Sequence, residues 1–226
     1  MSAAIAQHTP AIVYIAYPNN PTANLWNADT IRRIIQQVTA YGGLVVMDEA
    51  YQPFSSRSWL DDIRQHPQAN ANVLLMRTLS KFGLAGIRLG YMLASAALLN
   101  EVDKLRPPYN VSVLNAECAL FALEHESVFA QQAATIRAER ERLFNALQSL
   151  PQVTPYASDA NMLLVRFAGA PDAAQRVFES LKAQKVLVKN VSKMHPLLSN
   201  CLRLTVGTPD ENKQLMSALT VALATP

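Results

Sequence analysis

The residues with the clearest chemical potential lie within residues 77–91, which read R-T-L-S-K-F-G-L-A-G-I-R-L-G-Y. Lys81 follows the hydroxyls of Thr78 and Ser80 and precedes a glycine-containing loop that ends at Arg88. An amine among hydroxyls, glycine amides and a guanidinium indicates a nucleophile beside a phosphate-binding site. Taken alone, a lysine in such a loop is more often an ordinary exposed residue, so the surrounding elements have to decide.

Two more polar clusters follow apolar runs that are typical of buried parallel strands. The three runs are residues 11–17, 44–47 and 72–76. Asn20 follows the first run, Asp48 and Tyr51 follow the second, and Thr78 and Lys81 follow the third. Because the carboxyl ends of parallel strands share the sheet edge where α/β proteins bind ligands, we expect these side chains to come together.

This set of groups suits a phosphorylated heteroaromatic aldehyde. The Lys81 amine would condense with the aldehyde, while the Asp48 carboxylate would keep a ring nitrogen protonated. Tyr51 and Asn20 would hydrogen-bond a ring oxygen, and the hydroxyls with Arg88 would hold the phosphate. Pyridoxal 5′-phosphate carries every one of these groups, so it is the cofactor that we expect.

Other interpretations exist for several of these residues. Asp48-Glu49 after an apolar strand also resembles the Walker B strand of an ATPase, although no G-x-x-x-x-G-K-[ST] accompanies it. Glu49 should point away from Asp48, because side chains alternate across a strand, and we assign it no catalytic role. Asn161 could line a substrate pocket or simply complete a turn.

Composition narrows the class of protein. Half of the 226 residues are apolar and 16% are charged, which is typical of a globular chain with a sizeable core. The net charge is only +3 and the basic residues are scattered, so no nucleic-acid partner is expected. No apolar run approaches the roughly 18 residues of a membrane span, and we expect a cytoplasmic protein. Cys118 and Cys201 are predicted to be reduced core thiols, and no metal site is expected.

The order of elements predicts an α/β fold with a largely parallel sheet, followed by a smaller α+β unit. Residues 1–10 show no anchor, and Asp29 is expected to cap a helix whose apolar positions include Ile31 and Val38. Further strands are predicted at 89–94, 162–167, 186–189 and 201–206, and further helices at 59–66, 97–106, 173–184 and 210–224, with two more within 111–150. The predicted divisions are 1–106 for a partial large domain, 107–150 for connecting helices and 151–226 for a small domain.

Five motifs carry a resemblance that covers essentially the whole chain. They are N-N-P-T at 19–22, D-E-A-Y at 48–51, T-L-S-K…L-A-G-I-R-L-G-Y at 78–91, S-D-A-N at 158–161 and N-C-L-R-L-T-V-G-T at 200–208. Together they resemble the fold-type-I pyridoxal-phosphate aminotransferases, and most closely their histidinol-phosphate branch. The resemblance implies the PLP-transferase-like fold of the aspartate aminotransferase type.

The resemblance also implies roles for individual residues. Lys81 matches the Schiff-base lysine that shuttles a proton, and Arg203 matches the arginine that takes the carboxylate of glutamate or 2-oxoglutarate. Arg203 would also meet a substrate phosphate, for which Lys189 stands where relatives often have a second arginine. Asn161 is the remaining candidate in the substrate pocket. The cofactor residues implied are Asn20, Asp48, Tyr51, Thr78, Ser80, Lys81 and Arg88.

The implied reaction moves an amino group between L-histidinol phosphate/imidazole-acetol phosphate and glutamate/2-oxoglutarate in histidine synthesis. Small-molecule donors and acceptors are thus the expected partners, and the full-length family form is expected to be a homodimer. Open alternatives are an aromatic aminotransferase, a phosphothreonine-type decarboxylase, or an inactive remnant that acts only as a binding or dimerisation module.

The chain also departs from the family pattern. Ala23 stands where a glycine usually follows N-P-T, which makes the local turn geometry a point to examine. The family's N-terminal segment has no counterpart before the strand at 11–17, so the chain is expected to be a fragment. An incomplete sheet would leave an edge and apolar faces exposed, so low solubility and weak cofactor binding are expected.

Overall fold

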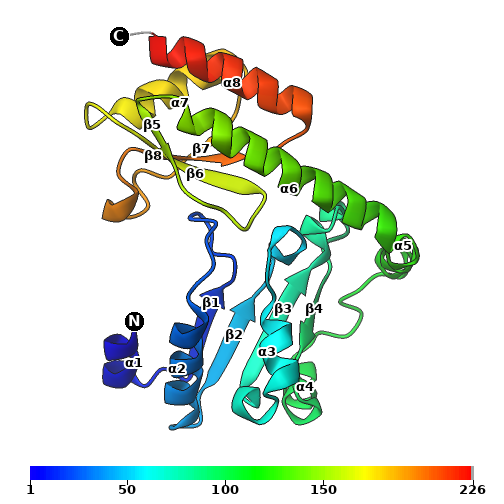
Figure 1. The fold of residues 1–226 in the computed structure, drawn as a ribbon. Helices are drawn as coiled ribbons and strands as arrows, with labels where there is room; N and C mark the ends of the chain where they lie inside the picture. The colour runs from blue at the N-terminus through cyan, green and yellow to red at the C-terminus, as the bar shows by residue number, and fades with distance from the viewer. Residues whose placement is uncertain (225–226) are drawn as a thin grey trace. The chain divides into compact units, whose positions relative to one another are not determined.

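The computed structural model describes residues 1–224 and divides into two compact units, each with its own four-stranded sheet. The first unit comprises residues 1–19 and 25–131, and the second comprises residues 20–24 together with the chain from residue 132 onward. The short segment 20–24 therefore leaves the first unit directly after its first strand. The helix α6 (Glu126–Gln148) contains the other point at which the chain passes between units (Figure 1).

The sheet of the first unit places its strands in the order β1-β2-β3-β4. The strands are β1 (Ile12–Ala16), β2 (Leu44–Asp48), β3 (Val73–Thr78) and β4 (Gly90–Leu93). The first three are parallel, and β4 is antiparallel to β3. Ala16 pairs with Asp48 and Asp48 with Met76, so the carboxyl ends of these three strands lie at the same edge. The expected largely parallel sheet is confirmed.

Helices α2 (Ala28–Thr39) and α3 (Trp59–Gln65) cover one face of this sheet (Figure 1). The predicted apolar stripe of α2 is fully buried, including Ile31 and Val38. The prediction that Asp29 caps this helix is wrong. Asn27 is the cap, since its extended backbone lets the side chain accept a hydrogen bond from the Thr30 N–H at 3.0 Å. Asp29 instead lies in the first turn, where a negative charge favours the helix dipole.

The prediction that residues 1–10 have no anchor is also wrong. They form the helix α1 (Ser2–His8), whose Ile5 is buried in the same core as α2. The Gln37 side chain donates to the Ser2 carbonyl at 3.0 Å and ties the two helices together. A single apolar residue provides no periodic pattern, so this helix depends on a contact that only the folded chain supplies.

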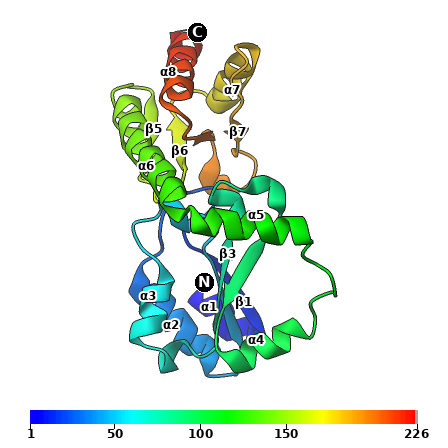
Figure 2. The same cartoon turned by 90° about the vertical axis from the view of Figure 1, so that its right-hand side faces the viewer.

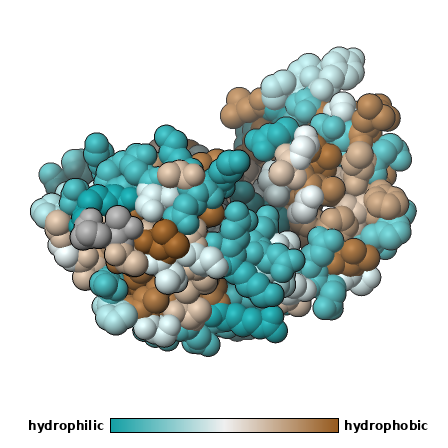
Figure 3. Space-filling model, turned by 90° about the horizontal axis from the view of Figure 1, so that it is seen from above, coloured by the Kyte–Doolittle hydropathy of each residue, from teal (hydrophilic) through white to brown (hydrophobic). Residues whose placement is uncertain are grey.

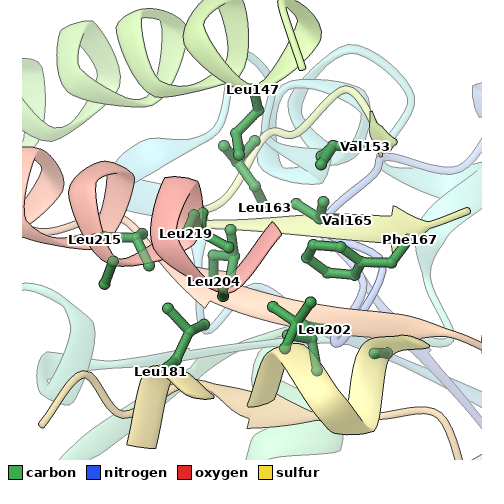
Figure 4. Close-up of a cluster of buried hydrophobic side chains, with 14 of the residues drawn as sticks. Leu147, Val153, Leu163, Val165, Phe167, Leu181, Leu202, Leu204, Leu215 and Leu219 are labelled. Carbon is green, nitrogen blue, oxygen red and sulfur yellow. The ribbon is translucent and has the colours of Figure 1, made fainter. Parts of the chain in front are cut away.

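The second unit has an antiparallel sheet in the order β5-β6-β8-β7. Its elements are β5 (Val153–Pro155), β6 (Met162–Phe167), α7 (Ala173–Ala183), β7 (Lys189–Asn190), β8 (Cys201–Thr205) and α8 (Pro209–Ala224). Leu163 and Val165 of β6 and Leu202 and Leu204 of β8 pack against the helices in one apolar core, as Figure 4 shows. Pro209 is the first residue of the last helix, where its missing N–H costs no helical hydrogen bond.

Two details of this unit differ from the predicted elements. Strand β5 was not predicted, because three residues carry too little pattern. The strand predicted at 186–189 is wrong, since only Lys189–Asn190 pair with β8. Lys185 has φ 62, and the Val186 N–H donates to the Leu181 carbonyl at 2.9 Å, so these residues finish α7 before a ladder can begin.

The remaining helices are α4 (Ala96–Asp103), α5 (Val113–Glu124) and α6 (Figure 2). The apolar residues of helix α5 do not gather on one side, so its sequence could not show which face is buried. Ala119 and Ala122 are buried, whereas Cys118 is exposed, and the prediction of Cys118 as a core thiol is wrong. Cys201 is buried and free, as predicted. Between residues 1 and 224 we find no helix with the length and apolarity needed to cross a membrane.

Candidate active site

The carboxyl ends of β2 and β3 carry the candidate cofactor residues of the first unit. Asp48 closes β2, and its Oδ1 atom accepts a hydrogen bond from the Ala50 N–H at 2.9 Å. This short loop fixes the carboxylate at the strand end, where it is half-buried. Thr78 closes β3 at the same sheet edge. The predicted meeting of the Asp48 and Thr78 clusters at one edge is therefore present in the structure.

Lys81 lies in a 3₁₀ turn, Leu79–Lys81, that directly follows β3. The turn begins with a side-chain cap, since Thr78 Oγ1 accepts from the Ser80 N–H at 3.0 Å. The Lys81 Nζ atom is 5.5 Å from the centroid of the Tyr51 ring, a cation–π distance. Within residues 1–224 the Lys81 amine forms no ion pair with a carboxylate. The Lys81 amine therefore lies beside the Tyr51 phenol and is not paired with a carboxylate of the described residues.

The loop after Lys81 folds back onto the end of β3. The Leu79 N–H donates to the Leu89 carbonyl at 3.0 Å, and Thr78 Oγ1 donates to the same carbonyl at 3.4 Å. Arg88 has φ 51, and its Nη1 atom donates to Ser80 Oγ at 3.4 Å. Two hydroxyls and a guanidinium therefore stand together next to Lys81. This is a donor set that suits a phosphate group.

Glu49 points away from Asp48, as strand alternation predicts, and it enters the buried side of the sheet. It is 1% exposed, and its Oε2 atom accepts from Nε and Nη2 of Arg77 at 3.0 and 2.9 Å. Burial lowers the pKa of Arg77, but hydrogen bonds to Tyr91 and Glu49 raise it more, so the net pKa is above its ordinary value. The predicted residue set did not include Arg77. Its position on the next strand, on the same sheet face as Glu49, is the feature of the sequence that could have identified it.

Two predicted residues of the second unit contact each other although 183 positions separate them. Arg203 Nη1, on β8, donates to Asn20 Oδ1 at 2.8 Å. The Arg203 Nε atom is buried and has no hydrogen-bond partner within the described residues 1–224. Lys189 pairs with Arg203 across β7 and β8, so both side chains leave the same sheet face. An arginine donor without a partner, beside a second cation, suits an anionic ligand.

The N-N-P-T and S-D-A-N motifs also meet in the second unit. The Asp159 N–H donates to the Ala23 carbonyl at 2.7 Å. Ala23 has φ 61, so it keeps the left-handed backbone that a glycine adopts more readily. The Asn161 carbonyl accepts from the Val206 N–H at 2.9 Å, while its half-buried side chain has no assigned role in the geometry. A part for Asn161 in substrate binding remains a prediction.

The residues of the first unit fit the cofactor that the sequence suggests. An amine, a carboxylate, a phenol, hydroxyls and a guanidinium occur within one strand-end region, from Lys81, Asp48, Tyr51 and the Thr78–Arg88 segment. Each functional group of a phosphorylated pyridine aldehyde has a complementary group in this set. Asn20 belongs to the second unit, where its observed partner is Arg203.

Comparison with known sequences gives a consistent result. A family model described as aminotransferase class I and II matches residues 1–219. The chain is 63% identical over 224 residues to the histidinol-phosphate aminotransferase of Paracidovorax citrulli, covering 99% of this chain and 60% of that protein. It is 62% identical over 223 residues to that of Polaromonas naphthalenivorans, covering 99% of this chain and 59% of that protein. The chain thus spans about 60% of the length of these curated relatives.

Solved structures show the same fold. The histidinol-phosphate aminotransferase from Clostridium acetobutylicum superposes with a TM-score of 0.85 at 19% identity, covering 98% of this chain and 67% of that one. The enzyme from Sinorhizobium meliloti, solved in complex with pyridoxal-5′-phosphate, gives 0.84 at 25% identity, covering 98% of this chain and 59% of that one. The expected PLP-transferase fold is therefore confirmed.

Proposed function

Because the chain belongs to the family of class I and II aminotransferases, we propose that it serves a pyridoxal-phosphate-dependent transamination. The amino group would pass between L-histidinol phosphate/imidazole-acetol phosphate and glutamate/2-oxoglutarate, in the synthesis of histidine. The observation that carries the proposal is the Lys81 amine at the carboxyl edge of a parallel sheet, 5.5 Å from the Tyr51 ring and next to a hydroxyl–guanidinium group. The proposed choice of substrates is supported by relatives that are about 62% identical to this chain.

Each residue of the first unit has a task in this proposal. When bound, pyridoxal 5′-phosphate supplies an electron sink for the carbon that exchanges the amino group. The Lys81 amine would hold the cofactor at its aldehyde carbon, with loss of water, and would carry a proton as general acid and base. The Asp48 carboxylate would keep the ring nitrogen protonated. Tyr51 would donate its phenolic O–H to the ring oxygen, and Thr78, Ser80 and Arg88 would bind the phosphate.

The second unit would hold the substrate. Arg203 has a buried Nε donor without a partner within residues 1–224, and a carboxylate could accept from it and from a terminal nitrogen together. Lys189 adds a second positive charge on the same sheet face, without the planar fork of an arginine. Asn20 would serve the cofactor ring oxygen, and Asn161 the substrate pocket. The proposal includes a homodimer for the full-length form and a cytoplasmic location.

The lysine assignment can be tested by covalent capture. The protein is incubated with pyridoxal 5′-phosphate, reduced with sodium borohydride, digested and analysed by mass spectrometry. We expect one adduct, on Lys81, and its loss in Lys81→Ala. The exposed Lys104, the C-cap residue of α4, lies in the same unit, so Lys104→Ala is a matched control that keeps the adduct. An adduct that persists in Lys81→Ala, or that is scattered over surface lysines, would remove this assignment.

Substrate choice needs a separate experiment. The cofactor-loaded protein is mixed with L-histidinol phosphate, L-phenylalanine or L-threonine O-3-phosphate, and the change in cofactor absorbance is followed. A response that is fastest with L-histidinol phosphate, without release of carbon dioxide, is expected. A preference for phenylalanine would favour an aromatic aminotransferase, and carbon dioxide release a decarboxylase. Cofactor capture without any response would indicate a binding module only.

A further inference from the structure

We propose that Glu49 is a positioning residue, which acts through Arg77 to fix the strand ends from which Asp48 and the Lys81 turn project. This inference rests on the proposed function, since it concerns the same cofactor site. Glu49 does not touch the candidate site itself, because its side chain leaves the opposite face of the sheet. Its influence therefore has to pass through the backbone of β2 and β3.

The Glu49 carboxylate joins several elements of the first unit. Arg77 on β3 donates to Oε2 through two nitrogens, at 3.0 and 2.9 Å. Ser58 Oγ lies 3.0 Å from both carboxylate oxygens, and the Trp59 N–H donates to Oε1 at the start of α3. The Arg77 Nη2 atom also donates to Ser58 Oγ at 2.8 Å. One buried carboxylate thus fixes the positions of β2, β3 and the first turn of α3.

The position of this network along the strands connects it to the candidate chemistry. Glu49 directly follows Asp48, and Arg77 directly precedes Thr78. The Glu49 N–H donates to the Met76 carbonyl at 2.8 Å and extends the β2–β3 ladder by one step beyond Asp48. The ion pair therefore closes the last step of the ladder on one face, while Asp48, which pairs with Met76, and Thr78, two residues further along β3, leave the other face. A shift of this last step of the β2–β3 ladder would move both Asp48 and Thr78.

Energetics favour a geometric role for the pair over a purely stabilising one. A buried ion pair gains little over well-packed apolar residues, because both charges lose their hydration. What apolar residues could not supply is the planar two-nitrogen fork of Arg77, which sets distance and orientation between two strands. The Glu49 carboxylate sets the position of the Arg77 guanidinium.

The surroundings of Arg77 leave room for movement if Glu49 is lost. A cavity of about 510 Å³ is bordered by both members of the pair and by Thr78 and Tyr91. Without the carboxylate, the half-buried guanidinium would lose its counter-charge and could turn into this space. The ends of β2 and β3 would then no longer be held in a fixed position relative to each other.

The test compares the whole chain with Glu49→Gln and with Arg77→Lys, a milder change that keeps the charge. Glu139→Gln is the matched control, since Glu139 is also a buried, ion-paired glutamate but lies in the second unit. Two quantities are measured with pyridoxal 5′-phosphate: its affinity, by absorbance titration, and the visible circular dichroism of the bound cofactor. We expect both Glu49→Gln and Arg77→Lys to bind at least about tenfold more weakly, with reduced dichroism. Glu139→Gln should match the unsubstituted chain.

A measurement without cofactor separates this inference from the proposed function. Hydrogen exchange of peptides spanning residues 48–52 and 78–82 should accelerate in Glu49→Gln and Arg77→Lys, and not in Glu139→Gln. If the unsubstituted chain bound no pyridoxal phosphate but this exchange effect appeared, the proposed function would fail, while the link from Glu49 through Arg77 to the two strand ends would stand. Unchanged exchange would overturn the positioning role. Faster exchange with unchanged affinity and dichroism in a cofactor-binding chain would overturn it too, because Glu49 would then be structural only.

Discussion

At the scale of single residues, the candidate site depends on how each polar group is held before any ligand arrives. Asp48 has Oδ1 engaged by the Ala50 N–H, and the hydroxyl of Thr78 caps the turn that carries Lys81. These local hydrogen bonds orient the carboxylate and the amine through the backbone of their own strands. The side chains are therefore preorganised, which lowers the entropic cost of binding a cofactor.

Replacing Asp48 by Asn tests the proposed role of its charge. Asparagine keeps an oxygen that can accept from Ala50, so the local turn should survive. A charge-assisted hydrogen bond to a ring nitrogen would be lost, at about 1.5–3 kcal/mol, which corresponds to roughly a tenfold to hundredfold weaker binding of pyridoxal phosphate. Absorbance titration measures this directly. Asp103→Asn on the exposed α4 serves as control, and equal affinities for both variants would rule out the assigned role.

At the scale of elements, the second unit depends on how its helices begin and how they contact one another. Helix α8 begins after Thr208, whose N–H and Oγ1 both donate to Glu211 Oε2, at 2.7 and 2.9 Å. The Glu211 N–H lies 3.4 Å from Thr208 Oγ1, which completes a capping box. Hydrogen bonds from the Thr208 backbone and side chain lower the pKa of Glu211. This start fixes α8 on β6 and β8, the sheet that carries Arg203.

Removing this cap should weaken the unit measurably. Thr208→Ala deletes the hydroxyl that serves the Glu211 N–H, and such caps contribute about 0.5–2 kcal/mol to the free energy of unfolding. Urea unfolding followed by circular dichroism gives the difference. Thr220→Ala, an exposed threonine in the same helix, is the control and should change stability by less than the cap variant. Equal losses in both would mean that the capping box contributes nothing.

Helices α6 and α8 are joined by a buried glutamate whose ionisation should make stability depend on pH. Glu139 accepts from Asn212 Nδ2 at 3.0 Å and pairs with Arg142. The hydrogen bond from Asn212 and the charge of Arg142 together lower its pKa below the ordinary 4.5, although burial opposes the shift. Because the pKa of Glu139 is lower in the folded state than in the unfolded state, ionised Glu139 stabilises the fold at pH values above the ordinary pKa. That contribution is lost as the pH falls through the lowered value.

The measurement is a urea midpoint recorded from neutral pH down into the acid range. The unsubstituted chain should be more stable than Glu139→Gln above pH 4.5, and the difference should shrink as the pH falls below it. Glu124→Gln, an exposed glutamate of α5, should follow the unsubstituted chain at every pH. A difference between Glu139→Gln and the unsubstituted chain that stays constant with pH would contradict the assigned ionisation.

At the scale of the whole molecule, several large apolar side chains are exposed to solvent. Tyr14 of β1 is 65% exposed, and Leu114 and Phe121 of α5 are 77% and 61% exposed. Apolar patches also lie among polar residues on the face shown in Figure 3. β1 and β4 are the outer strands of their sheet, so among the described residues each has one edge without a ladder partner. Such edges and apolar surfaces favour association with other chains.

A double substitution tests whether these surfaces limit solubility. Tyr14→Lys and Phe121→Glu together place charges on β1 and α5 without touching the candidate site. The unsubstituted chain should associate with rising concentration, and the double variant should remain smaller and bind less hydrophobic dye. Light scattering over a concentration series gives the result. If the unsubstituted chain is monodisperse and monomeric at every concentration, these surfaces do not drive association.

Local patterns in the sequence determined much of this protein. Period-2 and period-3.6 apolar spacing located most strands and helices, because one buried face imposes that spacing on the chain. Asp48, Tyr51 and Lys81 could be placed at one sheet edge, because parallel strands bring their carboxyl ends together. Their roles toward a cofactor remain predictions that the proposed experiments address.

Contacts between distant parts of the chain were decided only by the tertiary structure. Ile5 anchors α1, Arg77 meets Glu49, and Arg203 meets Asn20, although no local pattern encodes these partners. The exposure of Cys118 could not be predicted either, since the apolar residues of α5 do not gather on one side. A periodic pattern reports that a face is buried, but not what buries it. The partner of a buried charge depends on how strands and helices pack, and packing exists only in the folded chain.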